Sequence, residues 1–464
     1  MIISIVGAVA IFAIIVIVHE AGHFTVAKRM GVRVLRFSVG YPPRVWGFRR
    51  GRTDYAIGAT PLGGYVRMLG DEIASDEPAA ETLRGYLEEV KLDLVGAARS
   101  HRSIAEGDDD RVLVQLADEA EQAEVAAAQR AASGAIVSAS AGELMAIGRP
   151  PTTTERLLLR AVARYRDPKL AIEHLVEDHP GALLEEFKQQ AFPSQPLRRR
   201  FAIVLAGPAA NILFAPLLMM ITLMVGMPIA LAVIGTVDRG LPGYTAGLRS
   251  GDHVLAINDN PVDSWDDFSR MVKASNGQPL RLRVERTTGN RAQILNLVVQ
   301  PKLVVIPTIY GDKEPTWIIG VGQSGAEGIE RLPPWRAITQ GLVETARMGA
   351  TLTTGIAKIV EGATPVREAL GGPIMIARIA GREVHRGFAN VALFMMMISL
   401  ELGIINLLPI PMLDGGHVLF FAIEAVKGSP LKLRHREIAM QVGLFILAVL
   451  MAFVIFNDLS HLVG

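Results

Sequence analysis

The chain has 464 residues, of which 50% are hydrophobic, and its mean hydropathy is positive. Such a composition is typical of a membrane protein that also carries soluble segments. The formal net charge of +1 argues against nucleic acid as a partner. Because the chain contains no cysteine, disulfides and thiolate metal sites are excluded, and a metal would have to bind through His, Asp or Glu.

Four apolar runs predict four membrane-spanning helices. The first, Met1–Val18, carries no charged side chain and as a helix would cover roughly 27 Å, close to the thickness of a bilayer core. A cleaved signal peptide is the alternative, but no basic segment precedes this run and no small-residue cleavage site follows it. The remaining runs are Phe201–Ile234, Val391–Leu413 and Ile438–Phe456.

Basic clusters indicate the orientation of these runs. The sequence "AKRMGVRVLRF" follows the first run, "LRRRF" begins just before the second, and "VKGSPLKLRHRE" separates the third from the fourth. All three clusters lie on one side if the chain crosses the membrane four times, and by the positive-inside rule this side is cytoplasmic. Both termini, and the long segment between the second and third runs, are therefore expected to face outward.

The first run ends in the sequence HEAGH, residues 19–23. Residues i and i+4 share one face of a helix, so His19 and His23 can bind a single Zn²⁺ ion. Glu20 beside them can hold a water molecule and take its proton. Ionisable side chains inside a membrane are costly and usually functional. A catalytic zinc site needs a third ligand, and the chain lacks the third histidine of the pattern HExxHxxGxxH.

The third run supplies the best candidate for this ligand, in the sequence "NLLPIPMLDGGH". Pro409 and Pro411 are expected to break the helix there, which a membrane tolerates only where protein or water surrounds the backbone. Asp414 is therefore predicted as the third ligand; the alternative is a carboxylate that caps a helix end. The first and third runs both cross toward the cytoplasmic side, so HEAGH and Asp414 should reach a similar depth. Three further histidines fit no ligand spacing and are interpreted as surface or structural residues: His253, His385 and His417.

Two segments on the predicted cytoplasmic side follow different patterns. Residues 34–69 alternate in hydrophobicity and are interrupted by Gly and Pro, which predicts a β-hairpin sheet at the membrane surface. An edge strand of this sheet could hold an unwound substrate through main-chain hydrogen bonds, or the sheet could be only a platform. Residues 71–190 are rich in Ala, Glu, Leu and Arg and predict several helices, joined around "EGDDD", "SASAG" and "GRPPTTT". We interpret them as a poorly packed linker or an accessory helical module.

Residues 234–303 predict a small β-rich domain on the outer side. Within it, residues 250–252 form a turn before a short strand, and residues 279–299 predict a hairpin that turns at Gly289-Asn290. The pattern resembles a PDZ domain, which binds an extended peptide at a sheet edge and often captures the peptide's C-terminus. A spacer domain without a ligand is the alternative.

Several motifs occur together in a fixed order: HEAGHF, PLGGYVRM, IVLAGPAAN, LGGPIMIA and NLLPIPMLDGGH, with the PDZ-like domain among them. In this combination the chain resembles the site-2 protease family, in particular the bacterial regulator-of-sigma-E (RseP) type, over about residues 1–70 and 195–464. The resemblance implies an intramembrane zinc metalloprotease of the bacterial inner membrane. Such enzymes cut transmembrane segments of single-span proteins such as anti-sigma factors, after a first protease has removed the outer domain, and can clear signal-peptide remnants.

The resemblance also implies roles for individual residues. His19, His23 and Asp414 match the zinc ligands of the family, and Glu20 matches its general base. Two asparagines match residues that bind the substrate or support the site, Asn211 in "GPAAN" and Asn406 in "NLLPIP".

The chain departs from the family pattern in three ways. Residues 71–190 form an insertion where a short link is expected, and one PDZ-like unit is evident where the best-known members have two. Glu401 stands where a neutral polar residue is expected. We expect Glu401 to line the path of substrate or water to the metal, unless it lies solvated near the outer surface.

The predicted fold is a polytopic α-helical membrane protein with about four transmembrane helices, a membrane-surface β-hairpin sheet, one PDZ-like β-rich domain and a helical insertion. Two rival functions remain open, a membrane-anchored PDZ scaffold with an inert HEAGH sequence and a transporter that uses Glu401 and Asp414.

The chain is predicted to consist of six segments. They are the first transmembrane helix with the β platform (1–70), the cytoplasmic insertion (71–195), the second transmembrane helix (196–233), the PDZ-like domain (234–303), a periplasmic linker with amphipathic helices (304–386), and the last two transmembrane helices (387–464). One amphipathic helix of the linker is expected to be anchored at the membrane interface by Trp335.

Overall fold

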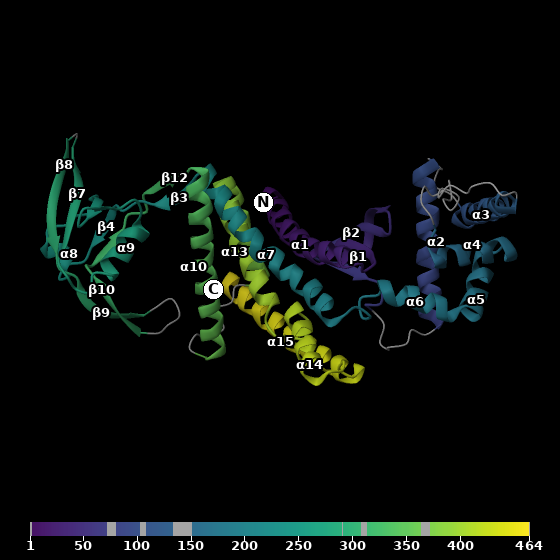
Figure 1. Cartoon of the computed structure of the whole chain (residues 1–464). Helices are drawn as coiled ribbons and strands as arrows, with labels where there is room; N and C mark the ends of the chain where they lie inside the picture. The colour runs from purple at the N-terminus through teal and green to yellow at the C-terminus, as the bar shows by residue number, and fades with distance from the viewer. Residues whose placement is uncertain are drawn as a thin grey trace. The chain divides into compact units, whose positions relative to one another are not determined.

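The computed structural model describes residues 2–71, 80–102, 108–132, 151–289, 291–307, 313–362 and 372–463. The chain divides into two compact units, each assembled from distant parts of the sequence (Figure 1). The first unit comprises Met1–Ile11, Ile212–Ile404 and Leu447–Gly464, and the second comprises Phe12–Asn211 and Ile405–Ile446. The predicted join at "SASAG", residues 138–142, lies outside the described residues.

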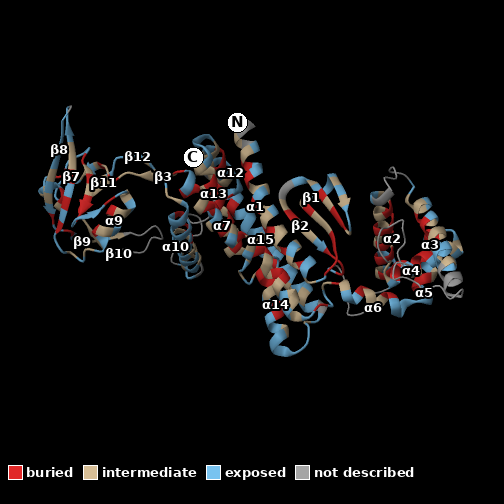
Figure 2. Ribbon diagram, turned by 45° about the horizontal axis from the view of Figure 1, so that its top comes forward, coloured by how far each residue is buried: buried red, intermediate tan, exposed pale blue. Residues whose placement is uncertain are grey.

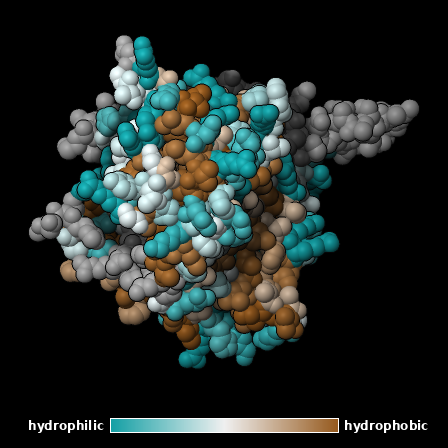
Figure 3. Space-filling view, turned by 90° about the vertical axis from the view of Figure 1, so that its left-hand side faces the viewer, coloured by the Kyte–Doolittle hydropathy of each residue, from teal (hydrophilic) through white to brown (hydrophobic). Residues whose placement is uncertain are grey.

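The described residues include four helices that are long and apolar enough to cross a membrane, as predicted. They are α1 (Ile2–Arg29), α7 (Leu197–Val225), α13 (Phe388–Asn406) and α15 (Leu433–Val463). Large apolar side chains on these helices are exposed, for example Phe445 and Phe456 on α15, as expected of surfaces that face lipid. Figure 2 colours the exposed residues pale blue, and Figure 3 shows apolar surface in brown. The chain is thus a multi-pass, mostly helical membrane protein.

Two ends of the predicted spans were wrong. Helix α1 continues past Val18 to Arg29, so HEAGH lies inside the helix and not at its end. Helix α7 ends at Val225, nine residues before Ile234. The cause is Gly226, whose φ of 134° is incompatible with a helix, and a short strand follows it. Apolar composition alone does not distinguish this strand from the end of a span.

The third predicted run is broken as expected. Helix α13 ends at Asn406, and a new helix, α14 (Asp414–Lys427), begins at Asp414. Pro409 and Pro411 lie between them, where a missing N–H and a restricted preceding residue prevent helix formation. Gly415 and Gly416 pack against backbone of this irregular segment so closely that added Cβ atoms would clash with its carbonyl groups.

The predicted hairpin sheet is present, and we call it the β platform. It consists of β1 (Val34–Arg50) and β2 (Thr53–Met68), which pair antiparallel. Both strands bend, so residues 34–39 of β1 pair with residues 64–68 on one side and with residues 54–57 on the other. One edge of the platform is therefore formed by residues 64–68.

The insertion forms a helical module with its own core, so the interpretation as a poorly packed linker was wrong and that of an accessory module was correct. Buried leucines of α2, α3 and α4, including Leu87, Leu113 and Leu158, pack together in this core. The buried residues on these helices are red in Figure 2. The helices are α2 (Ala80–Arg102), α3 (Asp109–Ala132), α4 (Thr153–Tyr165), α5 (Pro168–Asp178) and α6 (Pro180–Gln190).

The first unit contains the β-rich domain. Its four-stranded sheet has the order β6-β5-β7-β8, and β4 pairs with β11, β3 with β12, and β9 with β10. The predicted hairpin is confirmed, because Thr288 pairs with Arg291; Asn290 of its turn lies outside the described residues. The elements are β3 (Met227–Ala230), β4 (Ile234–Val237), α8 (Pro242–Thr245), β5 (His253–Ile257), β6 (Asn260–Pro261), α9 (Trp265–Lys273), β7 (Leu280–Thr288), β8 (Arg291–Val299), β9 (Lys302–Pro307), β10 (Lys313–Ile318), β11 (Val321–Gln323) and β12 (Glu327–Glu330).

The predicted end of this domain at Leu303 was too early. Ile319 belongs to the same buried core, and β11 pairs with β4 at the start of the domain. The strands after Leu303 are short and separated by glycines, which is why the sequence favoured a linker there. The domain therefore extends to β12.

Among the described residues, helices α10 and α12 connect the β-rich domain to α13. Helix α10 (Pro334–Val360) is the predicted amphipathic helix, and Trp335 at its start is exposed. Helix α12 (Pro373–Arg386) is held at its N-terminus by Asp458 of α15, which accepts hydrogen bonds from the backbone N–H groups of Gly372, Ile374 and Met375.

Candidate metal centre

Helix α1 brings the two histidines of HEAGH to one face. His19 and His23 stand one helical turn apart, and their Nε2 atoms are 3.3 Å from each other. Their rings meet edge to face, with centroids 4.9 Å apart. Both residues are 9% exposed, so the pair is largely shielded from its surroundings.

Asp414 completes a cluster of three side chains. Its Oδ2 atom lies 3.1 Å from Nε2 of His19 and 3.4 Å from Nε2 of His23. Asp414 is the first residue of α14, so the break after α13 directs the chain toward α1. Within the part of the chain that the structure describes, this is the one group of His, Cys, Asp or Glu side chains whose ligand atoms all lie within 4.8 Å of one another.

The cluster has the dimensions of a zinc site. Zinc binds histidine nitrogen and carboxylate oxygen at about 2.0–2.2 Å in a tetrahedral arrangement, which separates neighbouring donor atoms by about 3.3 Å. The three donor–donor distances here run from 3.1 to 3.4 Å. Two imidazoles and one carboxylate would leave the fourth position open, as a hydrolytic site requires.

Helix α7 orients both histidines through contacts with their Nδ1 atoms. Nδ1 of His23 donates a hydrogen bond to the carbonyl of Ile203 at 2.8 Å, and Nδ1 of His19 lies 3.3 Å from the side-chain amide of Asn211. The oxygen and nitrogen of an Asn side chain are assigned from the surrounding hydrogen bonds. The oxygen of Asn211 can therefore face His19 and accept a hydrogen bond from Nδ1. Both contacts leave Nε2 without a proton and available to a metal. Asn211 is fully buried, which favours the second of its two expected roles, support of the site.

Two glycines allow α7 to approach α1 this closely. A Cβ atom on Gly22 would lie 2.2 Å from the carbonyl oxygen of Ala206, and one on Gly207 would lie 2.2 Å from Nε2 of His23. Sequence reasoning noted the motif "IVLAGPAAN" but missed this packing role. The small residues in that motif were the available signal, because they are typical of close helix contacts in membranes.

A charged anchor holds α14 to α7. The guanidinium of Arg200 contacts both carboxylate oxygens of Glu424, with Nη1 to Oε2 at 3.2 Å, and it also lies over the ring of Phe421 at 5.1 Å. The Arg200 and Glu424 side chains are only 13% and 15% exposed. The sequence indicated Arg200 only as part of a basic cluster. In the structure it fixes the helix that begins with Asp414.

Glu20 lies between the histidines and the β platform. A Cβ atom added to Gly64 would come within 3.0 Å of Cγ of Glu20, so the platform edge passes directly beside this carboxylate. Tyr41 of β1 is also near, and burial together with the Glu20 carboxylate raises the pKa of Tyr41. A hydrolytic base and the edge strand of the β platform are thus adjacent.

The other predicted residues are not part of the three-residue cluster. Asn406 is the half-buried last residue of α13, and Glu401 belongs to the first compact unit, so its expected place on the path to the metal stays a prediction. The three further histidines have partners of other kinds: His385 contacts Ser4 at 3.1 Å, His253 lies 4.0 Å from Glu285, and the ring of His417 packs on Phe420.

Comparison with known proteins identifies the family of the chain. The profile of peptidase family M50 matches residues 7–450. The zinc metalloprotease RasP of Geobacillus kaustophilus is 30% identical over 458 residues, which cover 98% of each chain. The protease RseP of Yersinia pestis and the regulator of sigma-W protease RasP of Bacillus subtilis are 28% and 26% identical, with 99% of each chain covered. The chain therefore belongs to peptidase family M50, the site-2 proteases, and is a zinc metalloprotease.

Proposed function

We propose that this enzyme hydrolyses peptide bonds inside the membrane, with His19, His23 and Asp414 as zinc ligands and Glu20 as general base. The observation that carries the proposal is the cluster of three donor atoms, 3.1 to 3.4 Å apart, whose two histidines lie on an apolar helix long enough to span the membrane. Ionisable groups are retained at such a position when they have a function.

Each residue has a distinct task in this reaction. Zinc, when bound, polarises the scissile carbonyl and makes the attacking water more acidic. Glu20 takes a proton from that water as the oxygen of the water bonds to the carbonyl carbon. Glu20 then gives the proton to the leaving nitrogen as the carbon–nitrogen bond breaks. Ile203 and Asn211 keep the two imidazoles in the orientation that presents Nε2.

The β platform would hold the substrate in an extended form. A transmembrane helix hides its carbonyl groups in backbone hydrogen bonds and must unwind before water can attack. The edge strand at residues 64–68 pairs with β1 on one side and runs beside Glu20, so a substrate strand could add to its other side. Gly64 has no side chain, which lets this strand pass close to Val16 and Glu20 of α1.

The basic clusters support an orientation in the bacterial inner membrane with both termini outside and the active site toward the cytoplasm. The relative from Bacillus subtilis is named as a regulator of sigma-W protease, and on this ground we propose single-span anti-sigma factors as substrates, with signal-peptide remnants as a second class. The bilayer itself is the other partner of the four apolar helices.

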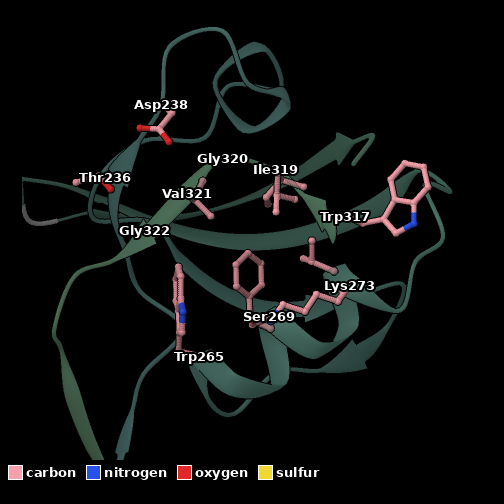
Figure 4. A pocket seen from close by; sticks show the side chains of 13 residues that line it. Thr236, Asp238, Trp265, Ser269, Lys273, Trp317, Ile319, Gly320, Val321 and Gly322 are labelled. Carbon is pink, nitrogen blue, oxygen red and sulfur yellow. The ribbon is translucent and has the colours of Figure 1, made fainter. Parts of the chain in front are cut away.

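We further propose that the β-rich domain is PDZ-like and binds peptide C-termini. A groove of about 260 Å³ lies between α9 and β11. Figure 4 shows Trp265, Ser269 and Lys273 along α9 on one side, opposite Ile319 to Gly322. The carbonyl of Gly320 bonds to the N–H of Asp238 next to β4, so the alternate residue Val321 directs its N–H and C=O to the opposite edge, where a peptide strand could pair.

The proposed reaction is testable with the purified enzyme in lipid vesicles. A single-span substrate with a short outer segment should be cut within its span, and mass spectrometry of the fragments should locate the cut. Removing zinc with a chelator should stop cleavage, and adding zinc back should restore it, because only bound zinc offers a coordination position for the attacking water. An uncut substrate with a zinc-loaded enzyme, or cleavage that ignores the chelator, would contradict the proposal.

The role of the β-rich domain gives a separate prediction. If the domain excludes bulky substrates, replacing residues 227–331 with a short linker should permit cleavage of a substrate that keeps its full outer domain. If the domain instead recruits cut C-termini, the same deletion should lose the truncated substrate, and Ser269→Arg, which fills the groove, should lose it too. Gln293→Arg on the exposed β8 strand is the matched control and should change neither. Fragment yields on gels distinguish the two outcomes.

A further inference from the structure

A buried carboxylate joins the helical module to the β platform. Asp93 of α2 is 2% exposed, and its Oδ2 atom lies 2.6 Å from Nη2 of Arg33, itself 3% exposed. Its Oδ1 atom accepts a hydrogen bond from Arg49 at 2.8 Å, and Arg52 approaches to 3.6 Å. Three arginines therefore surround one acidic side chain at the contact between the two parts.

These arginines come from both ends of β1. Arg33 immediately precedes β1, Arg49 is near its last residue, and Arg52 lies in the turn to β2. Asp93 thus contacts residues at the beginning and at the end of a strand 17 residues long, and Glu89 of α2 makes a further contact with Arg49 at 2.9 Å. Main-chain bonds reinforce the contact, since the N–H of Arg33 donates to the carbonyl of Gln190 and the N–H of Phe192 donates to that of Leu69.

The packing between the two parts is continuous. Leu35 and Leu69 of the platform segment belong to the apolar core of the helical module. The ring of Tyr86 on α2 lies 5.6 Å from the guanidinium of Arg33. Burial raises the pKa of Asp93 and lowers the pKa of Arg33, so each charge needs the other to stay in the interior.

Strand β1 also pairs directly with the platform edge at residues 64–68. Ser38 and Val39 of β1 pair with Tyr65 and Gly64 of β2, and Gly64 is the residue beside Glu20. A shift of β1 would therefore move the edge relative to the base. We propose that the helical module is a rigid support that holds the platform edge at the active site, with Asp93 as the positioning residue. This inference rests on the proposed function of that edge.

The test uses Asp93→Asn, which keeps the shape of the side chain and removes its charge. Arg33 then loses the carboxylate that it contacts directly, and β1 should lose its fixed position. We expect kcat/KM for a single-span substrate to fall by about a hundredfold, because small misplacements at a reacting site have effects of this size. Zinc content should stay at the wild-type level. Glu124→Gln, which breaks the exposed pair of Glu124 with Arg160 on the same module, is the matched control and should leave cleavage unchanged.

A second variant separates positioning from the charge itself. In Arg33→Met with Asp93→Leu, apolar side chains replace the buried pair, which generally preserves packing. This double variant should recover cleavage to within about threefold of wild type, the range expected for a nearly neutral exchange. No recovery in a protein that retains zinc would overturn the idea that support of β1 is what Asp93 provides. Unchanged cleavage in Asp93→Asn would overturn it as well.

Cross-linking distinguishes failure of this inference from failure of the proposed function. The chain has no cysteine, so Arg67→Cys on the exposed platform edge can be paired with a cysteine in the substrate span. Cross-links that form in Arg67→Cys and are lost when Asp93→Asn is added to it are the expected result. If Arg67→Cys cleaves but forms no cross-link, the edge does not hold substrate. If cross-links persist after Asp93→Asn is added, the module does not position the edge.

Discussion

Glu20→Gln should lower kcat by about 10²–10⁴-fold, the usual contribution of a positioned general base. The amide has nearly the same size as the carboxylate, but it cannot take the proton of the attacking water. Zinc content should be unchanged, because Glu20 is not part of the three-atom cluster. Single-turnover cleavage of a spanning substrate, measured together with zinc content, provides the check.

The matched control for this variant is Glu437→Gln, an exposed carboxylate of α15, which should cleave like wild type. Near-normal cleavage by Glu20→Gln would remove Glu20 from the role of base. The two rival functions expected from the sequence, an inert scaffold and a transporter, are not supported, because the chain belongs to a family of zinc metalloproteases.

Asp414→Ala should abolish cleavage and weaken zinc binding by more than about a hundredfold. Loss of residues that only orient the ligands already costs up to about this factor, and Asp414 supplies a donor atom itself. Competition with a chromophoric chelator measures the affinity, and elemental analysis measures the zinc retained after purification. Full zinc content in Asp414→Ala would exclude Asp414 from the ligand set.

Glu424→Gln provides a graded comparison for Asp414→Ala. It leaves all three donor atoms in place and weakens only the contact of α14 with Arg200. We therefore expect a partial loss of zinc affinity, within about 10–100-fold, and measurable residual cleavage. An equal loss in both variants would show that the position of α14 matters as much as the carboxylate of Asp414.

The sequence by itself determined the features that depend on nearby residues. Hydrophobic runs of bilayer length indicated the four spans, and Pro409 and Pro411 indicated the break after α13. The spacing of His19 and His23 placed both rings on one face, because helical periodicity is a local property. Alternation predicted the β platform and the hairpin around residue 289, for the same reason.

Only the tertiary structure decided which distant residues meet. Asp414 reaches the histidines of α1 because α14 is anchored to α7 by Arg200, and α7 approaches α1 closely because Gly207 has no side chain. Asn211 is a buried partner of His19, a role that a motif resemblance left open. The helical module has a core that includes two leucines of the β platform segment, and Asp93 gathers arginines from both ends of one strand. Such contacts arise from packing between segments far apart in the chain, and no local pattern of hydrophobicity or charge encodes them.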